Sequence, residues 1–397
     1  TMDYEEFQAK IDDGVDVTQL PSRSAQETST LRERWHRTMS GQPVDAIPNF
    51  EFGYWASTLE TWHAQGLPPA VHDEATAYAY FGIESWQCAP VDVMGLRPRF
   101  EWIALEENED YITYRDDGGA TARINKHGDQ SIPQHLDFSL KDRASWEPFK
   151  ERLQADAARV PDNWPSLVEA YAKRAYPLAV PIGSMIGVPR NWIGFENIAL
   201  MIYDDPELLE EIVETLCTLV CDTLARIADD VTFDFGSGWE DICFNSGPIV
   251  GVDFMRDVVA PRYKRITDLL KRHGCSVSWT DTDGNILPII DSFLEGGINC
   301  MFPVEVHAGS DPVIMRKRWP GLLMQGGVDK MKLAQGGEAL VAELKKLTPL
   351  VREGGFIPGV DHRVPANVPL ANYKYYLKLK RDLFGVGGEP QYDESAI

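Results

Sequence analysis

The sequence predicts an α/β protein, a (β/α)8 TIM barrel with an N-terminal extension and a small antiparallel β insertion. After residue 142, short apolar runs alternate at least six times with amphipathic helical runs. Their spacing of roughly 25–45 residues is typical of a parallel sheet. No G-x-G-x-x-G or G-x-x-x-x-G-K-S/T motif follows a predicted strand. The sequence therefore does not indicate a nucleotide-binding Rossmann or P-loop fold. A single barrel with insertions accounts for 397 residues.

The N-terminal part of the chain consists of three segments that differ in their pattern of polar and apolar residues. Residues 1–30 are polar and loop-like, and we expect them to form an extension. Residues 31–41 are expected to form a short helix closed by a glycine, followed by an apolar strand over 46–55. Over about 91–140, apolar and polar residues alternate around turn residues, which is the period of antiparallel hairpins. We therefore expect one TIM-barrel domain over 31–397 with a β-rich insertion at about 91–140.

The remaining elements follow the strand–loop–helix order of a parallel barrel. Predicted strands and their exits are PLAVPIG (177–183), FDFGSGWED (233–241), CSVSWTDTDGN (275–285), INCMFPVEV (298–306), LLMQGGVD (322–329) and FIPGVDH (356–362). Predicted helices, with apolar residues at helical spacing, cover 206–230, 252–274, 286–297, 311–321 and 337–355.

The charge excludes some partner classes. There are 38 Lys and Arg against 61 Asp and Glu, which gives a net charge of −23. Such a field repels nucleic acid and anionic membranes but permits a neutral or cationic ligand or a basic protein surface. The six cysteines form no C-x-x-C pair, and the chain has neither a signal-peptide pattern nor an apolar run long enough for a membrane span. We expect a cytoplasmic protein.

Acidic and imidazole side chains recur where the predicted strands end. In a parallel barrel these positions meet at one mouth, and like charges that close need a cation, a shared proton or a cationic substrate. The alternative is that Asp241, Asp283 and Asp329 cap the helices that follow. The residues at the strand exits are Glu240, Asp241, Asp281, Asp283, Glu305, His307, Asp329, Asp361 and His362.

The segment Asp281-Thr282-Asp283-Gly284-Asn285 is the sharpest local motif. Two carboxylates two residues apart on an extended strand end point the same way, so both can meet one ion or one substrate group. The Gly and Asn also suit a tight turn, which is a purely structural explanation.

Aromatic residues near the predicted mouth are a second indication. Phe52 and Tyr54 follow the first strand, Trp239 adjoins Glu240, and other aromatics lie on later strands. Such side chains can stack on a planar ring or hold a cation, although core packing explains aromatic residues equally well.

Several long segments resemble the uroporphyrinogen decarboxylase-like superfamily of (β/α)8 barrels. These segments are RERWHRTMSGQPVDAIPNFEFGYW, FGSGWEDICFNSGPIVGVDFMRDVVAPRYKRITDLLKRHG, DTDGNILPIIDSFLEGGINCMFPVEV, GGVDK and GGFIPGVDHRVPANVPLANYKYY. The resemblance extends over roughly residues 30–385. True uroporphyrinogen decarboxylases hold a polycarboxylate with an early R-Q-A-G-R motif. Here the equivalent stretch is RERWHRTMSG, and an acidic mouth would repel that substrate.

The other branch of the superfamily contains corrinoid-dependent methyltransferases. Members specific for coenzyme M carry a zinc-binding H-x-C-G and a Cys in P-G-C. At the matching places this chain has Asp281-Thr282-Asp283-Gly284 and Pro358-Gly359-Val360-Asp361-His362. Hard oxygen donors and an imidazole thus replace the thiolates. Asp281, Asp283 and His362 are candidate ligands for zinc or another divalent metal, and they can equally carry proton chemistry without a metal.

The retained features are most similar to the methyltransferase components of O-demethylase systems. The resemblance implies transfer of a methyl group from a small methoxylated or methylated substrate to cobalamin on a partner corrinoid protein, and a homodimer. The implied catalytic residues are Glu240, Asp281, Asp283, Glu305 and His362, with Phe52, Tyr54, Trp239 and Asp361 binding the substrate. A decarboxylase or lyase acting on a small non-porphyrin substrate is the alternative, and a ligand-binding barrel without enzymatic activity is a third reading.

Overall fold

The computed structural model describes residues 29–127 and 133–397, so the predicted extension lies outside the described residues except for its last two positions. The described residues form three sheets. The largest is a seven-stranded parallel sheet in the order β1-β6-β7-β10-β11-β12-β13. Its strands are β1 (Gln87–Cys88), β6 (Leu178–Gly183), β7 (Phe235–Trp239), β10 (Val277–Asp281), β11 (Cys300–Phe302), β12 (Leu323–Val328) and β13 (Phe356–Val360).

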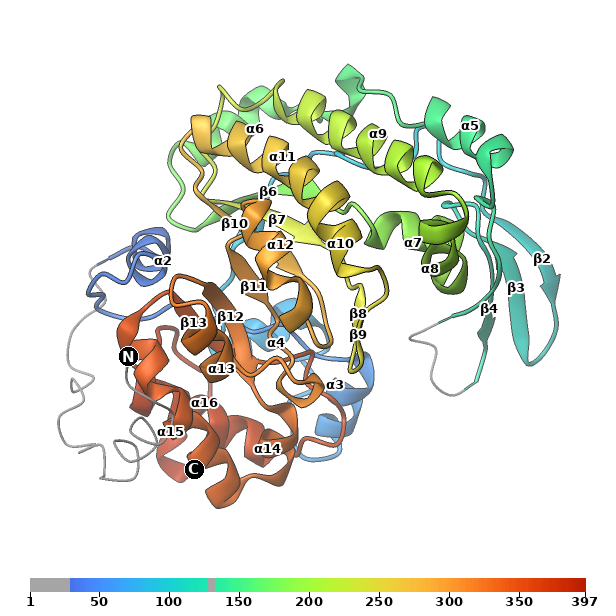
Figure 1. Ribbon diagram of the computed structural model, residues 1–397. Helices are drawn as coiled ribbons and strands as arrows, with labels where there is room; N and C mark the ends of the chain where they lie inside the picture. The colour runs from blue at the N-terminus through green and yellow to red at the C-terminus, as the bar shows by residue number, and fades with distance from the viewer. Residues whose placement is uncertain (1–28, 128–132) are drawn as a thin grey trace.

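Helices surround the parallel sheet, and neighbouring ones pack against each other, as α9 does on α11 and α15 on α16 (Figure 1). The helices are α2 (Leu31–Met39), α3 (Ala56–His63), α4 (Glu74–Phe81), α5 (Arg143–Glu151), α6 (Trp164–Tyr171), α7 (Gly187–Ile193), α8 (Phe195–Asp204), α9 (Pro206–Leu224), α10 (Val252–Phe254), α11 (Ala260–Arg272), α12 (Ile290–Glu295), α13 (Pro312–Arg318), α14 (Lys330–Gln335), α15 (Gly337–Glu353) and α16 (Leu370–Phe384). A π-turn over Met255–Val259 joins α10 to α11. Among the described residues, no helix is both long and apolar enough to cross a lipid bilayer.

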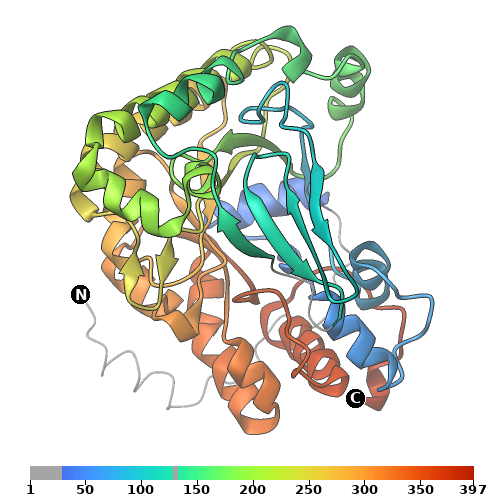
Figure 2. The same cartoon turned by 90° about the vertical axis from the view of Figure 1, so that its right-hand side faces the viewer.

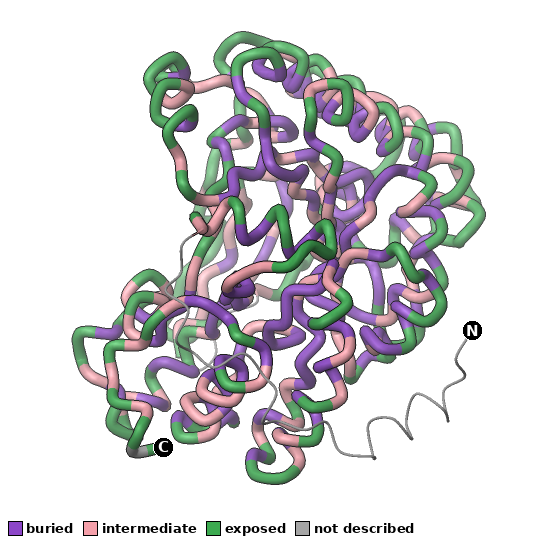
Figure 3. The backbone as a smooth tube through the Cα atoms, turned by 90° about the vertical axis from the view of Figure 1, so that its left-hand side faces the viewer, coloured by how far each residue is buried: buried purple, intermediate pink, exposed green. Residues whose placement is uncertain are grey.

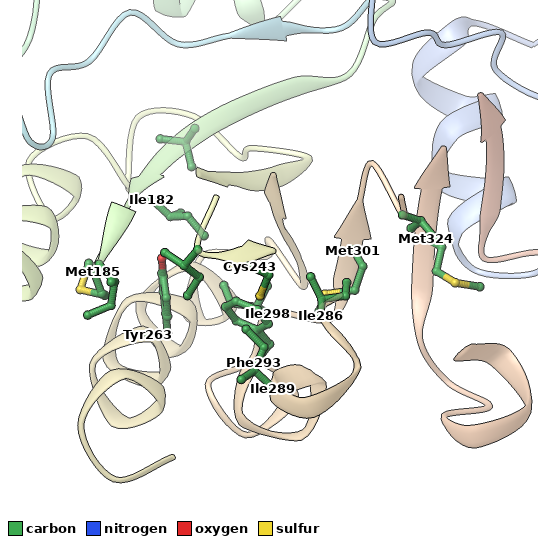
Figure 4. Close-up of a cluster of buried hydrophobic side chains, with 14 of the residues drawn as sticks. Ile182, Met185, Cys243, Tyr263, Ile286, Ile289, Phe293, Ile298, Met301 and Met324 are labelled. Carbon is green, nitrogen blue, oxygen red and sulfur yellow. The ribbon is translucent and has the colours of Figure 1, made fainter. Parts of the chain in front are cut away.

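The large hydrophobic core lies between the parallel sheet and these helices. Residues such as Met301 of β11, Tyr263 of α11 and Phe293 of α12 are fully or almost fully buried in it (Figure 4). Figure 3 shows buried segments running through the middle of the molecule, with exposed segments around them. Burial of this apolar surface supplies the main driving force for folding.

The sheet does not close into the eight-stranded barrel that the sequence predicts. The segment 47–54 lies in the eighth position, but it makes only isolated β-bridges, at Ile47 and Tyr54. Pro48 has no N–H to donate, and Gly53 has a φ of 103°, so a regular ladder is interrupted at both places. The backbone bonds of this segment include Glu84 N to Asn49 O at 3.0 Å and Val364 N to Gly53 O at 2.9 Å. The prediction of a parallel α/β sheet is confirmed, whereas a closed barrel is not.

A buried ion pair holds segment 47–54 beside β13. The Glu51 carboxylate accepts hydrogen bonds at 2.7 Å from Lys380 Nζ and Tyr376 OH of α16, and at 2.9 Å from the N–H of Val360. Both charged side chains are completely shielded from solvent. A side chain at Gly359 would come within 2.9 Å of Phe50 O, so glycine lets the two backbones approach closely.

The inside of the curled sheet has its own apolar cluster. Side chains from β6, β7, β11 and β13 meet Phe50 there, together with Trp35 and Met39 of α2. The Trp35 ring stacks on that of Phe235 at a centroid distance of 5.2 Å. Asp234, just before β7, accepts one hydrogen bond from Arg32 Nε at 2.7 Å and pairs with His36. Helix α2 therefore packs across the end of the sheet where the strands begin.

A four-stranded antiparallel sheet lies within the range assigned to the β insertion. Its strands pair in the order β2-β3-β4-β5, and Figure 2 shows it in front of the rest of the molecule. The strands are β2 (Ile103–Glu107), β3 (Tyr111–Arg115), β4 (Thr121–Asn125) and β5 (Gln134–Asp137), and a separate small hairpin consists of β8 (Cys243–Phe244) and β9 (Gly247–Pro248). The division of the chain into domains stays a prediction.

We predict that Lys380→Met destabilises the protein by about 3–5 kcal/mol, because it leaves the Glu51 carboxylate buried without a counter-charge. The free energy of unfolding is measured by chemical denaturation. The matched control is Lys378→Met on the same helix, which removes the exposed pair with Asp382 and is expected to cost less than about 1 kcal/mol. The double variant Glu51→Gln/Lys380→Met should recover part of the loss. Equal effects of the two lysine variants would contradict this account.

Candidate active site

A cavity of about 380 Å³ lies against the inner side of the parallel sheet. Two residues of β10, Trp279 and Asp281, face it, as expected for positions two apart on one strand. The other lining residues come from β11, β12, α4 and two extended segments. The complete lining consists of Phe50, Glu51, Phe52, Glu74, Tyr78, Glu84, Ser85, Trp86, Trp279, Asp281, Phe302 and Gln325.

Aromatic rings form much of the cavity wall. Phe302 makes edge-on contacts with both Phe52 and Trp279, each at a centroid distance of 4.6 Å. Trp86 meets Trp279 edge-on at 5.8 Å. Such contacts fix the orientation of the rings, and the wall can accept a flat apolar group.

Of the five residues predicted to be catalytic, Asp281 is the one that lines this cavity. Among the described residues, no hydrogen bond or ion pair reaches its carboxyl group. Its backbone carbonyl accepts the N–H of Glu240 at 2.8 Å, which ties the exits of β7 and β10 together. Burial raises the pKa of Asp281 well above its usual range, and the charges of Asp283 and Asp241 raise it further. Asp281 therefore holds a proton under conditions in which an ordinary Asp is ionised.

Asp283 is paired with His362 rather than directed to the cavity with Asp281. Asp283 Oδ2 lies 3.1 Å from His362 Nε2, while Asp283 Oδ1 is buried without a hydrogen-bond partner. Burial lowers the pKa of His362, but the hydrogen bond and charge of Asp283 outweigh it, so the pKa is raised. The imidazole ring stacks on that of Trp55 at a centroid distance of 5.7 Å and contacts that of Phe52 at 5.5 Å. This pair borders the cavity through Phe52.

Asp241 and Trp239 lie to one side of the cavity and do not line it. Asp241 has a φ of 48°, which is uncommon for a residue with a side chain. Arg190 lies over the Trp239 ring at 5.3 Å and within 3.5 Å of Asp241 Oδ2. Burial raises the pKa of Asp241 although Arg190 opposes the shift. The predicted role of Trp239 in the ring-binding wall finds no support in this position.

Glu240 is fully buried and holds the loop before α7. Its carboxylate accepts the backbone N–H groups of Met185 and Gly187 at 2.6 and 2.7 Å, and the hydroxyl of Tyr263. Burial raises the pKa of Glu240, although these hydrogen bonds oppose the shift. Both oxygens of the carboxylate are therefore occupied by hydrogen bonds within the protein, and neither is open to a substrate.

Glu305 and Asp361 also hold backbone at the strand ends. Glu305 accepts Lys330 Nζ at 2.6 Å and Gly284 N at 2.9 Å. Burial opposes its ionisation, but these bonds prevail and the pKa is lowered. Asp361 accepts the N–H groups of Val306 and Lys330 at 2.9 and 3.0 Å, and burial raises its pKa to about 6. Asp329 caps α14 through Met331 N, as the capping alternative predicts.

Tyr54 belongs to the core instead of the predicted substrate wall. Only 4% of its surface is exposed, and its hydroxyl lies 2.8 Å from that of Tyr373. Its ring packs edge-on against Trp62. Positions two apart on a regular strand share a face, but Gly53, which lies between Phe52 and Tyr54, has a positive φ that interrupts the extended segment. The two side chains therefore face different surroundings.

Sequence reasoning missed several residues of the cavity. Trp86, Tyr78, Ser85 and Gln325 line it but carry no motif. Trp86 lies just before the two-residue strand β1, which is too short to show a period. Gln325 occupies the third position of β12, and an uncharged polar residue inside an otherwise apolar strand is the one signal that points to it.

The predicted metal ligands do not form a ligand set in this arrangement. Among the described residues, no group of three or more His, Cys, Asp or Glu side chains is placed to hold a metal ion. His362 Nε2 is occupied by Asp283, and Asp281 faces the cavity separately. The geometry fits proton chemistry better than coordination of a divalent ion.

Comparison with solved structures identifies the fold. The chain is similar to a methyltransferase from Methanosarcina mazei, with 13% sequence identity, a TM-score of 0.55, and coverage of 89% of this chain and 99% of that one. It also matches a B12-independent methionine synthase from Shewanella sp. W3-18-1 in complex with selenomethionine, with 10% identity, a TM-score of 0.41, and coverage of 86% and 92%. No protein-family model and no curated protein sequence matches the chain. At 13% identity the first likeness shows a shared fold.

We predict that Asp283→Asn lowers the pKa of His362, because burial then acts without the opposing carboxylate. The titration of the imidazole is followed by NMR, with Asp257→Asn on an exposed helix as the control. The raised pKa also implies a pH dependence of stability. The contribution of the pair is complete below the pKa of His in an unfolded chain, about 6.5, and is lost as the pH rises through the higher folded value. An unchanged pKa in Asp283→Asn would contradict the pairing.

Proposed function

We propose that this protein is a methyltransferase that takes a methyl group from a small methoxylated or methylated substrate and delivers it to a corrinoid-binding partner protein, as in O-demethylase systems. The observation that carries the proposal is the position of the Asp281 carboxyl group, which lines an aromatic cavity of the right size for a small ligand and has no hydrogen-bond partner among the described residues. Burial raises the pKa of this group. The likeness in fold to a methyltransferase supports it.

The aromatic wall would hold the substrate. Phe52, Trp279 and Phe302 are already locked against one another, so a flat ring can bind between them without ordering the side chains first. Their apolar faces also exclude water from the reacting ether. The reaction requires that the bound ring places its ether oxygen within reach of the Asp281 carboxyl group.

Asp281 would act as the general acid. When the bond between the methyl carbon and the ether oxygen breaks, the electron pair stays on the oxygen, and the Asp281 proton neutralises the charge that develops there. The products on this chain are a hydroxyl compound and the Asp281 carboxylate. The reduced corrinoid of the partner protein supplies, when bound, the nucleophile that accepts the methyl group.

The Asp283–His362 pair would support this proton transfer from the side of the cavity. The charge of His362 favours an ionised Asp281 and that of Asp283 disfavours it, so the pair tunes the acidity of Asp281. Solvent reaches His362, which is 19% exposed in its side chain. A protonated imidazole at this place can return a proton after each turnover. No step in this mechanism requires a metal ion.

We predict that Asp281→Asn lowers the rate constant for methyl transfer by about 10²–10⁴-fold, the usual contribution of a general acid. The variant keeps the shape of the side chain but has no proton to give. Formation of methylcobalamin from reduced cobalamin and a methoxylated aromatic compound is followed by absorbance, with Asp257→Asn as the control. Activity of the wild-type protein should be complete at low pH and decline as the pH rises through the raised pKa of Asp281.

Two results would reject this function. An unchanged rate in Asp281→Asn would exclude the acid role. Release of CO₂ from a carboxylated substrate, without methyl transfer, would show that the same acid protonates a carbanion and that the protein is the decarboxylase of the alternative prediction.

A further inference from the structure

One row of side chains crosses the cavity wall on the neighbouring strands β10, β11 and β12 (Figure 1). Asp281 is paired in register with Phe302. Met301 is paired with Met324, so the next pair in that register is Phe302 and Gln325. Asp281, Phe302 and Gln325 all line the cavity. Since neighbouring strands lie roughly 4.8 Å apart, the backbone positions of Asp281 and Gln325 are separated by about 10 Å, with Phe302 between them.

The Gln325 amide is surrounded by apolar side chains of the sheet. Leu323 lies two positions earlier on β12, on the same side of the strand, and packs against the inner apolar cluster. Across the sheet, Gln325 lies between Phe302 of β11 and Ile357 of β13, and Ile357 is a fully buried member of that cluster. None of these three neighbours can exchange a hydrogen bond with an amide.

Gln325 is half-buried, and within the described part of the chain no side-chain or backbone group forms a hydrogen bond with its amide. Other polar residues of the lining are bound within the protein. Glu51 and Glu74 form ion pairs, and the Tyr78 hydroxyl donates to Glu51 O at 3.0 Å. A polar group in apolar surroundings costs free energy unless something satisfies it. The amide is therefore placed to contact what occupies the cavity.

We infer that Gln325 is a specificity-determining residue whose amide binds a hydroxyl group of the ligand, on the side of Phe302 away from Asp281. The amide has an acceptor oxygen and a donor nitrogen, and a hydroxyl group is able to pair with either of them. A ring that lies on Phe302 then presents one substituent to Asp281 and the hydroxyl to Gln325. The inference rests on the proposed function for the reaction at the Asp281 end, whereas the contact with Gln325 concerns binding alone.

This contact would also fix the orientation of the ring. A ligand with different groups at its two ends can enter the cavity in two directions, and only one of them pairs the hydroxyl with Gln325. The opposite direction leaves the buried amide without a partner, as does a ligand that carries a methyl group in place of the hydroxyl. Leaving such a group unpaired is what makes a hydrogen-bonding site selective.

The test measures the binding of 4-methoxyphenol and 4-methoxytoluene by isothermal titration calorimetry. The two probes differ by a hydroxyl against a methyl group of similar size. Gln325→Met keeps the length of the side chain and removes the amide, and we expect it to reduce the preference for the phenol at least tenfold. Gln42→Met makes the same change at an exposed position and should leave the preference as in the wild-type protein. An equal preference in wild-type and Gln325→Met, or binding of neither probe, would overturn the inference.

A purely structural role of Gln325 predicts a different result. Because the amide has no partner among the described residues, the denaturation midpoint of Gln325→Met should equal or exceed that of the wild-type protein. A lower midpoint, with both probes weakened alike, would show that the residue supports the fold instead of selecting the ligand. If Gln325→Met does not fold, Gln325→Leu replaces it.

Ser85 is another uncharged polar residue of the lining, and Ser85→Ala tests whether it makes the contact. We expect Ser85→Ala to keep the preference for the phenol. Loss of the preference in Ser85→Ala, but not in Gln325→Met, would overturn the assignment to Gln325. These titrations use no corrinoid. Selective binding without methyl transfer would reject the proposed function and keep this inference, whereas methyl transfer with an equal preference in Gln325→Met would do the opposite.

Discussion

The structure depends on the buried contact between the Glu51 carboxylate and Lys380. Segment 47–54 has no regular ladder to keep it in place, because Pro48 and Gly53 interrupt it. The carboxylate replaces that ladder with three hydrogen bonds to α16 and β13. Since Phe50, Glu51 and Phe52 line the cavity, the same contact sets the position of one cavity wall. Stability and binding geometry are therefore coupled at this point.

Buried carboxylates hold the backbone at other strand ends as well. Glu240 binds the loop before α7, Asp361 joins the exits of β11 and β12, and Asp234 fixes α2. Each satisfies N–H groups or cations that burial would otherwise leave unpaired, which is costly. Other acidic residues at the strand exits pair with a cationic or imidazole side chain, Asp283 with His362 and Asp241 with Arg190. The carboxyl group of Asp281 differs from all of these, because it has no hydrogen-bond or ion-pair partner among the described residues.

The sequence predicts the parallel α/β architecture well, because helical and strand periods are local properties. The helix 206–224 and the strands that end at Trp239 and Asp281 lie where the pattern places them. Closure of the sheet was not predictable, since an apolar run such as 46–55 looks the same whether it pairs regularly or not. The positions of the predicted strand ends also indicate which side chains gather near the mouth of the sheet. They do not indicate which hydrogen-bond or ion-pair partner each side chain has. Asp281 and Asp283 separate because only the fold shows that His362 takes Asp283.

Helix α2 links the end of the sheet where the strands begin to the lining of the cavity. Arg32 and Trp35 secure the end where the strands begin. Arg34 of the same helix pairs with Glu84 of the cavity lining, and Trp35 packs in one apolar cluster with Phe50, which also lines the cavity. A mutation in α2 that weakens these contacts therefore reaches the shape of the cavity as well as the packing of the sheet.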